Sequence, residues 1–197
     1  MKTISYPKMA EKALARFRAN LDEMGFPLAP GSSLPMTEPE FRAMVAEEIM
    51  GVAEGPPFEP GKYDCAQLVK GVARLLGCPM KGIAAAGSYS SPVSMRRALK
   101  RIGCETVADA CAMQKGWLEI APAMALQCDV IELADENPRE GEAGGFGLLA
   151  VALQNGRVLG YHEDAETLVV LQPETRDSYR RAWRLPAKVP VLEIPDG

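Results

Sequence analysis

Histidine is nearly missing from this sequence, which has 197 residues and one histidine, His162. The five cysteines, at positions 65, 78, 104, 111 and 128, include no Cys-x-x-Cys pair. Zinc sites take most of their ligands from cysteine and histidine at short, regular spacings. We therefore expect no metal and no cofactor, and we expect the thiols to be reduced, as in proteins made in the cytoplasm.

Long hydrophobic runs and concentrated charge are missing as well. No apolar stretch approaches the ~20 residues of a membrane-spanning helix, and the N-terminus lacks the apolar core of a signal peptide. Basic and acidic residues number 22 and 26, the two signs are interspersed, and the net charge is −4. These features predict neither a membrane span nor a nucleic-acid partner. A hydrophobic content of 47% suits one globular domain with an appendage.

The sequence pattern divides the chain into three parts. Residues 1–38 read as a helical extension and a linker, because apolar residues recur at helical spacing over 1–26 and Pro, Gly and Ser follow. Residues 39–185 form the main domain, and residues 186–197 an extended tail. The first half of the main domain has helical spacing, with predicted helices over 39–52, 64–77, 92–102 and 105–114.

The second half of the main domain is typical of strands. Apolar or alternating runs predict strands at 128–133, 146–153, 157–164 and 167–172, with a further short strand near 180–185. Residues 134–145 form a polar hairpin loop or a disordered insert, and "QNG" (154–156) is a hairpin turn signal. Helices followed by an antiparallel meander of about four strands indicate an α+β fold.

Cys65 stands at the head of a predicted helix, in "GKYDCAQLVKGVARLLG" (61–77). The helix dipole and unpaired backbone N–H groups favour the thiolate there, which is the nucleophilic form. A cysteine nucleophile also needs a base, and His162 is the one candidate. Against this, Cys65 shares a helix face with Leu68 and Val72, and spacing alone favours core packing. Asp64 is better explained as the helix N-cap than as an acid or base.

Three motifs of this sequence, in this order, resemble motifs of the NlpC-type cell-wall cysteine peptidases, which are small papain-like enzymes. "YDCAQL" (63–68) resembles the motif that carries their nucleophile, and "CDVIEL" (128–133) resembles their "GDLVFF" strand with Cys in place of Gly. "GLLAVALQNGRVLGYHED" (147–164) is similar to their histidine-bearing hairpin. The resemblance implies a papain-like core in which Cys65 takes the nucleophile position and Tyr63 the supporting tyrosine beside it.

Residues 41–185 resemble more closely a family of small phage proteins encoded among tail genes, itself similar to a divergent NlpC-type branch. The pieces that match are "PFEPGKYDC" (57–65), "SYSSPVSMRRALKRIG" (88–103), "CDVIEL", "GLLAVALQNG" and "RRAWRL" (180–185). The position of the usual base falls near Phe146–Leu148, where no histidine stands, while His162 matches the residue that orients the base. The resemblance therefore implies a peptidase scaffold without its usual base.

Two functional hypotheses follow from this resemblance. In the first, the protein is a structural component of a phage tail tip or baseplate, made in the host cytoplasm and docked on neighbouring tail proteins through residues 1–38 and the tail 186–197. In the second, it is a cysteine peptidase or amidase that cleaves peptidoglycan, with Cys65 as nucleophile and His162 as base. The absence of a histidine at the usual base position favours the structural hypothesis, because proton transfer by a base contributes orders of magnitude to the rate of such reactions.

Overall fold

The computed structural model describes residues 33–51, 57–81, 87–134, 148–161, 167–172, 178–189 and 191–193. The predicted helix over 1–26, nearly all of the insert at 134–145 and His162 lie outside these ranges. The division of the chain at residues 38 and 185 stays a prediction.

Four helices form where the sequence predicts them. They are α2 (Glu38–Met50), α3 (Cys65–Leu75), α5 (Pro92–Arg101) and α6 (Val107–Ala112). Side-chain caps fix their starts: Thr37 and Glu40 form a capping box on α2, and Asp64, Ser91 and Thr106 accept backbone N–H groups at the heads of the other three. Gly77, with a φ of 75°, follows the end of α3 and lets the chain turn away.

The sheet has six strands in the order β2-β7-β3-β4-β5-β6, and every pair in it is antiparallel. The strands are β2 (Leu118–Ile120), β3 (Val130–Leu133), β4 (Leu148–Ala152), β5 (Val158–Tyr161), β6 (Leu168–Leu171) and β7 (Tyr179–Arg184). Helices and an antiparallel sheet confirm the α+β class.

The expected strand number of about four is wrong. Strands β3 to β6 do form a sequential meander, but β7 returns to the other side of β3, and β2 pairs with β7. The sequence predicts no strand at residues 118–120, where β2 forms, and the 3-10 helix η1 (Pro122–Met124) follows it. A three-residue edge strand carries little pattern of its own, and only its pairing with a distant strand fixes it.

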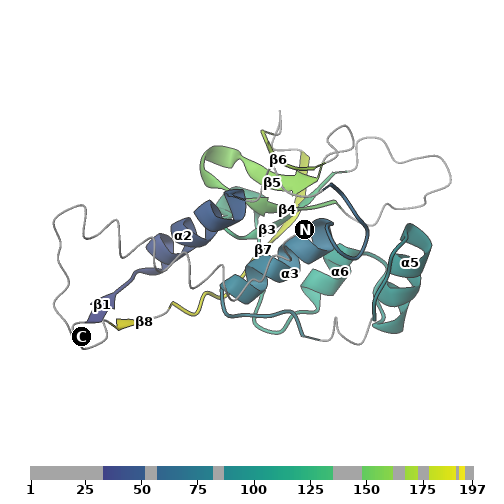
Figure 1. Cartoon of the computed structure of the whole chain (residues 1–197), viewed down its shortest axis with the longest axis horizontal. Helices are drawn as coiled ribbons and strands as arrows, with labels where there is room; N and C mark the ends of the chain where they lie inside the picture. The colour runs from purple at the N-terminus through teal and green to yellow at the C-terminus, as the bar shows by residue number, and fades with distance from the viewer. Residues whose placement is uncertain are drawn as a thin grey trace.

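Each face of the sheet buries its own set of apolar side chains. The face toward the helices contains Val130, Leu149, Val151, Leu159 and Trp183, which pack with α2, α3 and α6 in one large core. The opposite face carries the smaller cluster of Ile131, Ala150, Ala152, Val158 and Ala182. In Figure 1, α3 and α6 lie in front of the sheet, with α2 to one side and α5 at the far edge.

A buried ionic network joins the first helix of the domain to the last strand of the sheet. Asp129 is fully buried, and its two oxygens accept from Arg42 Nη1 at 3.0 Å and from Arg184 Nε at 3.2 Å. Arg42 also donates to the backbone carbonyls of Gln127 and Leu185. The motif pieces "CDVIEL" and "RRAWRL" therefore meet in space, and the contact between them is structural.

Cys128 occupies the position at which the resembling family has glycine. Its φ of 66° lies in the left-handed region, which glycine adopts most easily. The buried Sγ lies 3.3 Å from the backbone oxygen of Arg42. The backbone geometry thus explains why glycine suits this position, while the sulfur of this chain fills space beside α2.

Two short strands lie apart from the main sheet. β1 (Ser33–Pro35) and β8 (Val191–Glu193) pair antiparallel and form a two-stranded sheet at one end of the molecule (Figure 1). Both segments were expected to be linker or extended tail. Neither has the length or alternation of an isolated strand, so their pairing was not visible in the sequence.

Candidate functional site

The thiol of Cys65 lies in the first turn of α3, and the residue before it caps that helix. The carboxylate of Asp64 accepts hydrogen bonds from three donors: the backbone N–H of Gln67 at 2.9 Å, the backbone N–H of Gly61 and the hydroxyl of Tyr89 at 2.8 Å. The predicted N-cap is confirmed. Because Asp64 is buried and its oxygens are occupied, it is held in a structural role at the head of the helix.

Gly61 allows the two motif loops at the head of α3 to touch. Its φ is 80°, and a Cβ built there would lie 1.8 Å from the backbone oxygen of Tyr89. No side chain fits this approach. The glycine of "PFEPGKYDC" and the tyrosine of "SYSSP" are therefore in direct contact. This contact, which we call the joint at Asp64, holds Asp64 in place.

Tyr63 does not take part in the joint at Asp64. Its backbone pairs with Glu59 through hydrogen bonds of 2.9 and 2.8 Å, and the ammonium of Lys62 lies 5.1 Å from its ring centroid. The side chain that reaches Asp64 comes instead from Tyr89, which the sequence did not single out as a site residue. The supporting role assigned to Tyr63 stays a prediction.

The surroundings of Cys65 favour the neutral form of its thiol. Burial first, and then the neighbouring Asp64 carboxylate, raise its pKa to about 11 against the opposite effect of backbone N–H groups, that of Leu149 first. The helix head alone was expected to favour the thiolate. Desolvation between α3 and β4 and the charge of Asp64 oppose these backbone donors, so the contacts of the fold disfavour the thiolate that the helix head was expected to favour.

No histidine lies on the described part of the strand beneath the thiol. β4 places the backbone of Leu149 against the sulfur, with the Leu149 side chain buried in the core. Leu148 precedes it and is 41% exposed. Phe146, Gly147 and His162 lie outside the described residues. Of the predicted base position, the structure therefore describes Leu148 alone.

The end of β5 approaches the same region. The register of β4 and β5 pairs Val151 with Leu159, and its continuation brings Tyr161 opposite Leu149. The rings of Tyr161 and Phe58 meet edge to face, with centroids 5.5 Å apart. The last described residue before His162 is therefore packed against the loop that leads into Cys65.

A buried carboxyl group near the thiol was missed by the sequence reasoning. Glu132 lies on β3 directly across from Leu149, and burial raises its pKa. Cys111 of α6 is fully buried close by, and its pKa is raised by burial first and then by Cys65 and Glu132. Among the described residues no hydrogen bond joins Glu132 to Cys65. Its signal in the sequence was an acidic residue at a core-facing position of "CDVIEL".

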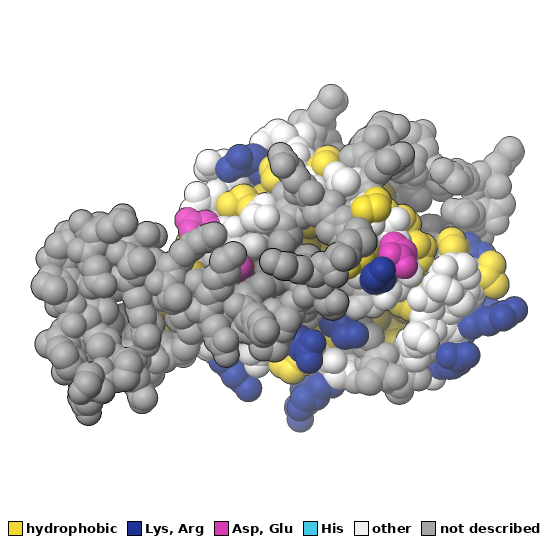
Figure 2. Space-filling model, in the orientation of Figure 1, with side chains coloured by type: hydrophobic (Ala, Val, Ile, Leu, Met, Phe, Trp, Pro, Cys, Tyr) yellow, Lys and Arg dark blue, Asp and Glu magenta, His cyan; other side chains and the backbone are white. Residues whose placement is uncertain are grey.

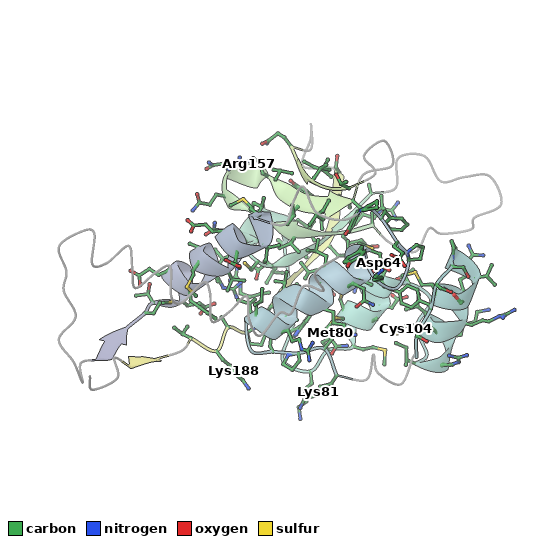
Figure 3. The ribbon with its side chains drawn as sticks, viewed as in Figure 1. Asp64, Met80, Lys81, Cys104, Arg157 and Lys188 are labelled. Atoms are coloured by element: carbon green, nitrogen blue, oxygen red, sulfur yellow. The ribbon has the colours of Figure 1, made fainter. Side chains whose placement is uncertain are left out.

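Two cavities lie elsewhere on the domain. One, of about 580 Å³, lies over the smaller apolar face of the sheet and is lined by Ile131, Ala152 and Tyr179 among others. The other, of about 350 Å³, lies between α3 and α5. Cys65 lines neither of them. Figure 3 shows Asp64 near the head of α3 and Arg157 at the β4–β5 turn, away from it.

The described residues include neither a cluster of metal-ligating side chains nor a membrane-spanning helix. In the described part of the chain, no three His, Cys, Asp or Glu side chains come together as metal ligands would. The described helices include none with the length and apolar character that crossing a bilayer requires.

Comparison with known proteins gives one family and one similar structure. Residues 36–185 match a family model described as a domain of unknown function, DUF6950. The peptidoglycan hydrolase RipB from Mycobacterium tuberculosis is similar in structure, with a TM-score of 0.38 and 16% sequence identity, over 92% of this chain and 84% of that one. No curated protein matches the sequence.

Proposed function

We propose a function for this chain, which belongs to the DUF6950 family of domains of unknown function: it is a non-hydrolytic scaffold domain, built like an NlpC-type cysteine peptidase, in the tail of a phage or a related element. The observation that carries the first half of this proposal is the packing of Cys65 beside the Asp64 carboxylate and the backbone of Leu149, which raises the pKa of the thiol to about 11. The motif resemblance described above supports the second half.

A thiol with this pKa is a weak nucleophile at neutral pH. About one thiol in ten thousand is ionised at pH 7 when the pKa is near 11, and an activated cysteine instead has a depressed pKa. Cleavage of an amide also needs a general acid for the leaving amine, which typically contributes 10²–10⁴-fold, roughly. The group held against this sulfur by β4 is a backbone amide, which cannot supply that proton.

The residues around Cys65 serve stability in this proposal. Asp64 caps α3 and ties it to Tyr89, while Asp129 ties α2 to the last strand. These contacts stabilise the fold whether or not the protein cleaves a substrate, because a fold can be kept while its catalytic function is lost. The extension over residues 1–38 and the tail from residue 186 then serve as attachments to neighbouring tail proteins.

An active peptidoglycan peptidase or amidase is the second candidate. One observation favours it: Tyr161 packs on Phe58 and lies opposite Leu149, so the chain next to His162 is close to the thiol. In this reading His162 takes the proton of Cys65, and binding of substrate lowers the pKa of the thiol.

Release of peptides from purified peptidoglycan separates the two candidates. We expect the wild type and Cys65→Ser to release equal, background amounts. Release by the wild type that falls to background in both Cys65→Ser and His162→Ala would contradict the scaffold proposal. The attachment role is tested in a particle assembly assay, where deletion of residues 1–38 should reduce tail assembly; intact tails from the deleted protein would contradict it.

A further inference from the structure

Charge is distributed unevenly along this chain. The sequence has seven basic residues and no acidic residue between Cys65 and Cys104, although the net charge of the whole chain is −4. Four of the seven basic residues fall within α5, and they are Arg96, Arg97, Lys100 and Arg101. The two signs are therefore separated in this stretch, and much of its positive charge is concentrated on one short helix.

The two sides of α5 differ in chemical character. Met95 and Leu99 are buried in the main core of the domain. Helical spacing places four basic residues and one valine on the opposite side, where all five residues are exposed. We call this surface the outer face of α5, and its residues are Val93, Arg96, Arg97, Lys100 and Arg101.

The outer face of α5 lies at the margin of the molecule. In Figure 1, α5 and the β1–β8 pair lie at opposite ends of the described elements, and Figure 2 shows Lys and Arg side chains projecting at the margin where α5 lies. Among the described residues, no ion pair involves Arg97 or Lys100. From Val93 to Arg101 the face extends about 12 Å along the helix.

We propose that the outer face of α5 binds the surface of a membrane that contains anionic phospholipid. The guanidinium and ammonium groups lie against the lipid phosphates, and the Val93 side chain lies at the level of the headgroups. Clusters of four or more basic residues are typical of this recognition, because each is attracted by the negative surface potential of the lipid. The binding goes beyond the proposed scaffold role and does not depend on the thiol of Cys65.

A protein partner fits this face less well than a lipid surface. Protein interfaces are built around side chains seated in pockets. The cavity beside α5 is lined by Met95, Ala98 and Leu99, which belong to the side of the helix opposite the outer face. A flat surface, in contrast, reaches a helix at the margin of the molecule without a pocket.

Nucleic acid also fits the outer face less well. Proteins that bind nucleic acid stack bases on aromatic rings or read base edges with Asn and Gln as well as Arg. The outer face has no aromatic and no amide side chain. Its one apolar residue, Val93, is 62% exposed, which suits contact with lipid rather than with phosphodiester groups.

Sedimentation of the full chain with lipid vesicles tests the proposal. One set of vesicles contains equal parts of phosphatidylglycerol and phosphatidylcholine, and the other contains phosphatidylcholine alone. We expect the partition coefficient to be at least about tenfold higher for the anionic vesicles, because each of the four cations gains from the surface potential. Added salt should lower this coefficient toward that of the neutral vesicles, because exposed charges are screened.

Two double variants carry the same change of charge at different places. Arg97→Glu with Lys100→Glu reverses charge on the outer face and should lower the partition coefficient at least about tenfold. Arg157→Glu with Lys188→Glu is the matched control, because both residues are exposed and lie away from α5 in Figure 3. The control should bind anionic vesicles as the wild type does. Val93→Ser should weaken binding about threefold without changing its dependence on salt.

Several outcomes would overturn the proposal. Equal partition into the two kinds of vesicle would do so, as would an equal loss of binding in the two double variants. Tighter binding of a DNA duplex or of polyglutamate than of the anionic vesicles, at the same total anionic charge, would assign the face to nucleic acid or to an acidic protein.

Circular dichroism shows whether each variant is folded. If Arg97→Glu with Lys100→Glu does not fold, Arg97→Ala with Lys100→Ala replaces it, because alanine favours a helix, and Arg157→Ala with Lys188→Ala becomes its control. The alanine variant on α5 should again bind anionic vesicles more weakly than its control. Equal binding by these two variants would contradict the assignment of the outer face.

Discussion

Tyr89 donates a hydrogen bond of 2.8 Å to Oδ2 of Asp64, across 25 residues of sequence. This contact joins the loop before α5 to the cap of α3, beside the thiol of Cys65. Because Asp64 also accepts from two backbone N–H groups, the bond completes the set of donors around a buried carboxylate. The head of α3 is therefore held by hydrogen bonds from Gly61, Gln67 and Tyr89 to the one carboxylate.

Removing the Tyr89 hydroxyl should destabilise the protein. We expect Tyr89→Phe to lower the free energy of unfolding by about 1–3 kcal/mol, because a hydrogen bond to a charged acceptor is lost inside the fold. Denaturant unfolding measures this. Tyr179→Phe is the control, since its hydroxyl donates to the exposed carbonyl of Gly156 at 2.8 Å and should cost about 1 kcal/mol or less. Equal losses in the two variants would argue against a special role of the Asp64 joint.

Gly61 should tolerate no side chain. We expect Gly61→Ala to cost more than the ~1–2 kcal/mol of a left-handed alanine, because its Cβ would meet the Tyr89 carbonyl at 1.8 Å. Gly103→Ala is a matched control: Gly103 has a φ of 76° and no atom within 4 Å of the added Cβ. The difference in melting temperature between the two variants isolates the clash. If the two variants melt together, the loops do not approach as described.

A third prediction concerns the buried ionic network around Asp129. Asp129→Asn removes the buried ion-pair partner of Arg42 and leaves it the exposed carboxylate of Glu38, and we expect a loss of about 3–5 kcal/mol in the free energy of unfolding. Glu119→Gln removes a partner of Arg181 at the surface and should cost about 1 kcal/mol or less. A loss in Asp129→Asn as small as in Glu119→Gln would show that the network contributes little.

Stability should fall as the pH rises from 9 to 11. The pKa of Cys65 is raised from 9.0 to about 11 in the folded protein, so the unfolded chain loses this proton first and is favoured at alkaline pH. The contribution is complete below pH 9 and is lost through pH 11. Cys78 and Cys128, with pKa values raised to about 11 and about 12, act in the same direction.

Unfolding by denaturant in the presence of a reductant, at a series of pH values, checks this. We expect Cys65→Ser to lose less stability between pH 9 and 11 than the wild type, because it lacks one of these protons. The same slope in both proteins would mean that Cys65 has an ordinary pKa in the fold.

Local patterns predicted most of the fold. The caps at Asp64 and Ser91 and the turn at Asn155–Gly156 are encoded within a few residues, so α3, α5 and the β4–β5 hairpin were found from the sequence. β2 and the β1–β8 pair were missed, since each depends on a partner distant in the chain. The insertion of β7 between β2 and β3 is likewise a property of the whole sheet.

The candidate site was predicted in position but not in chemistry. The sequence located Cys65 at the head of a helix and Asp64 as its cap. The high pKa of the thiol arises from burial against β4, and Tyr89 and Glu132 reach the site from other elements. None of these contacts has a signal within the motif "YDCAQL". Long-range packing, which a single sequence does not reveal, decides the protonation of the thiol.

The rate of alkylation of Cys65 as a function of pH tests the central claim most directly. Iodoacetamide reacts with the thiolate, and mass spectrometry of the peptide that contains Cys65 reports this thiol separately from the other four. We predict that the rate rises steeply toward an inflection near pH 11, with little reaction at pH 7. An inflection below pH 8 that His162→Ala moves upward would show an activated nucleophile and contradict the account.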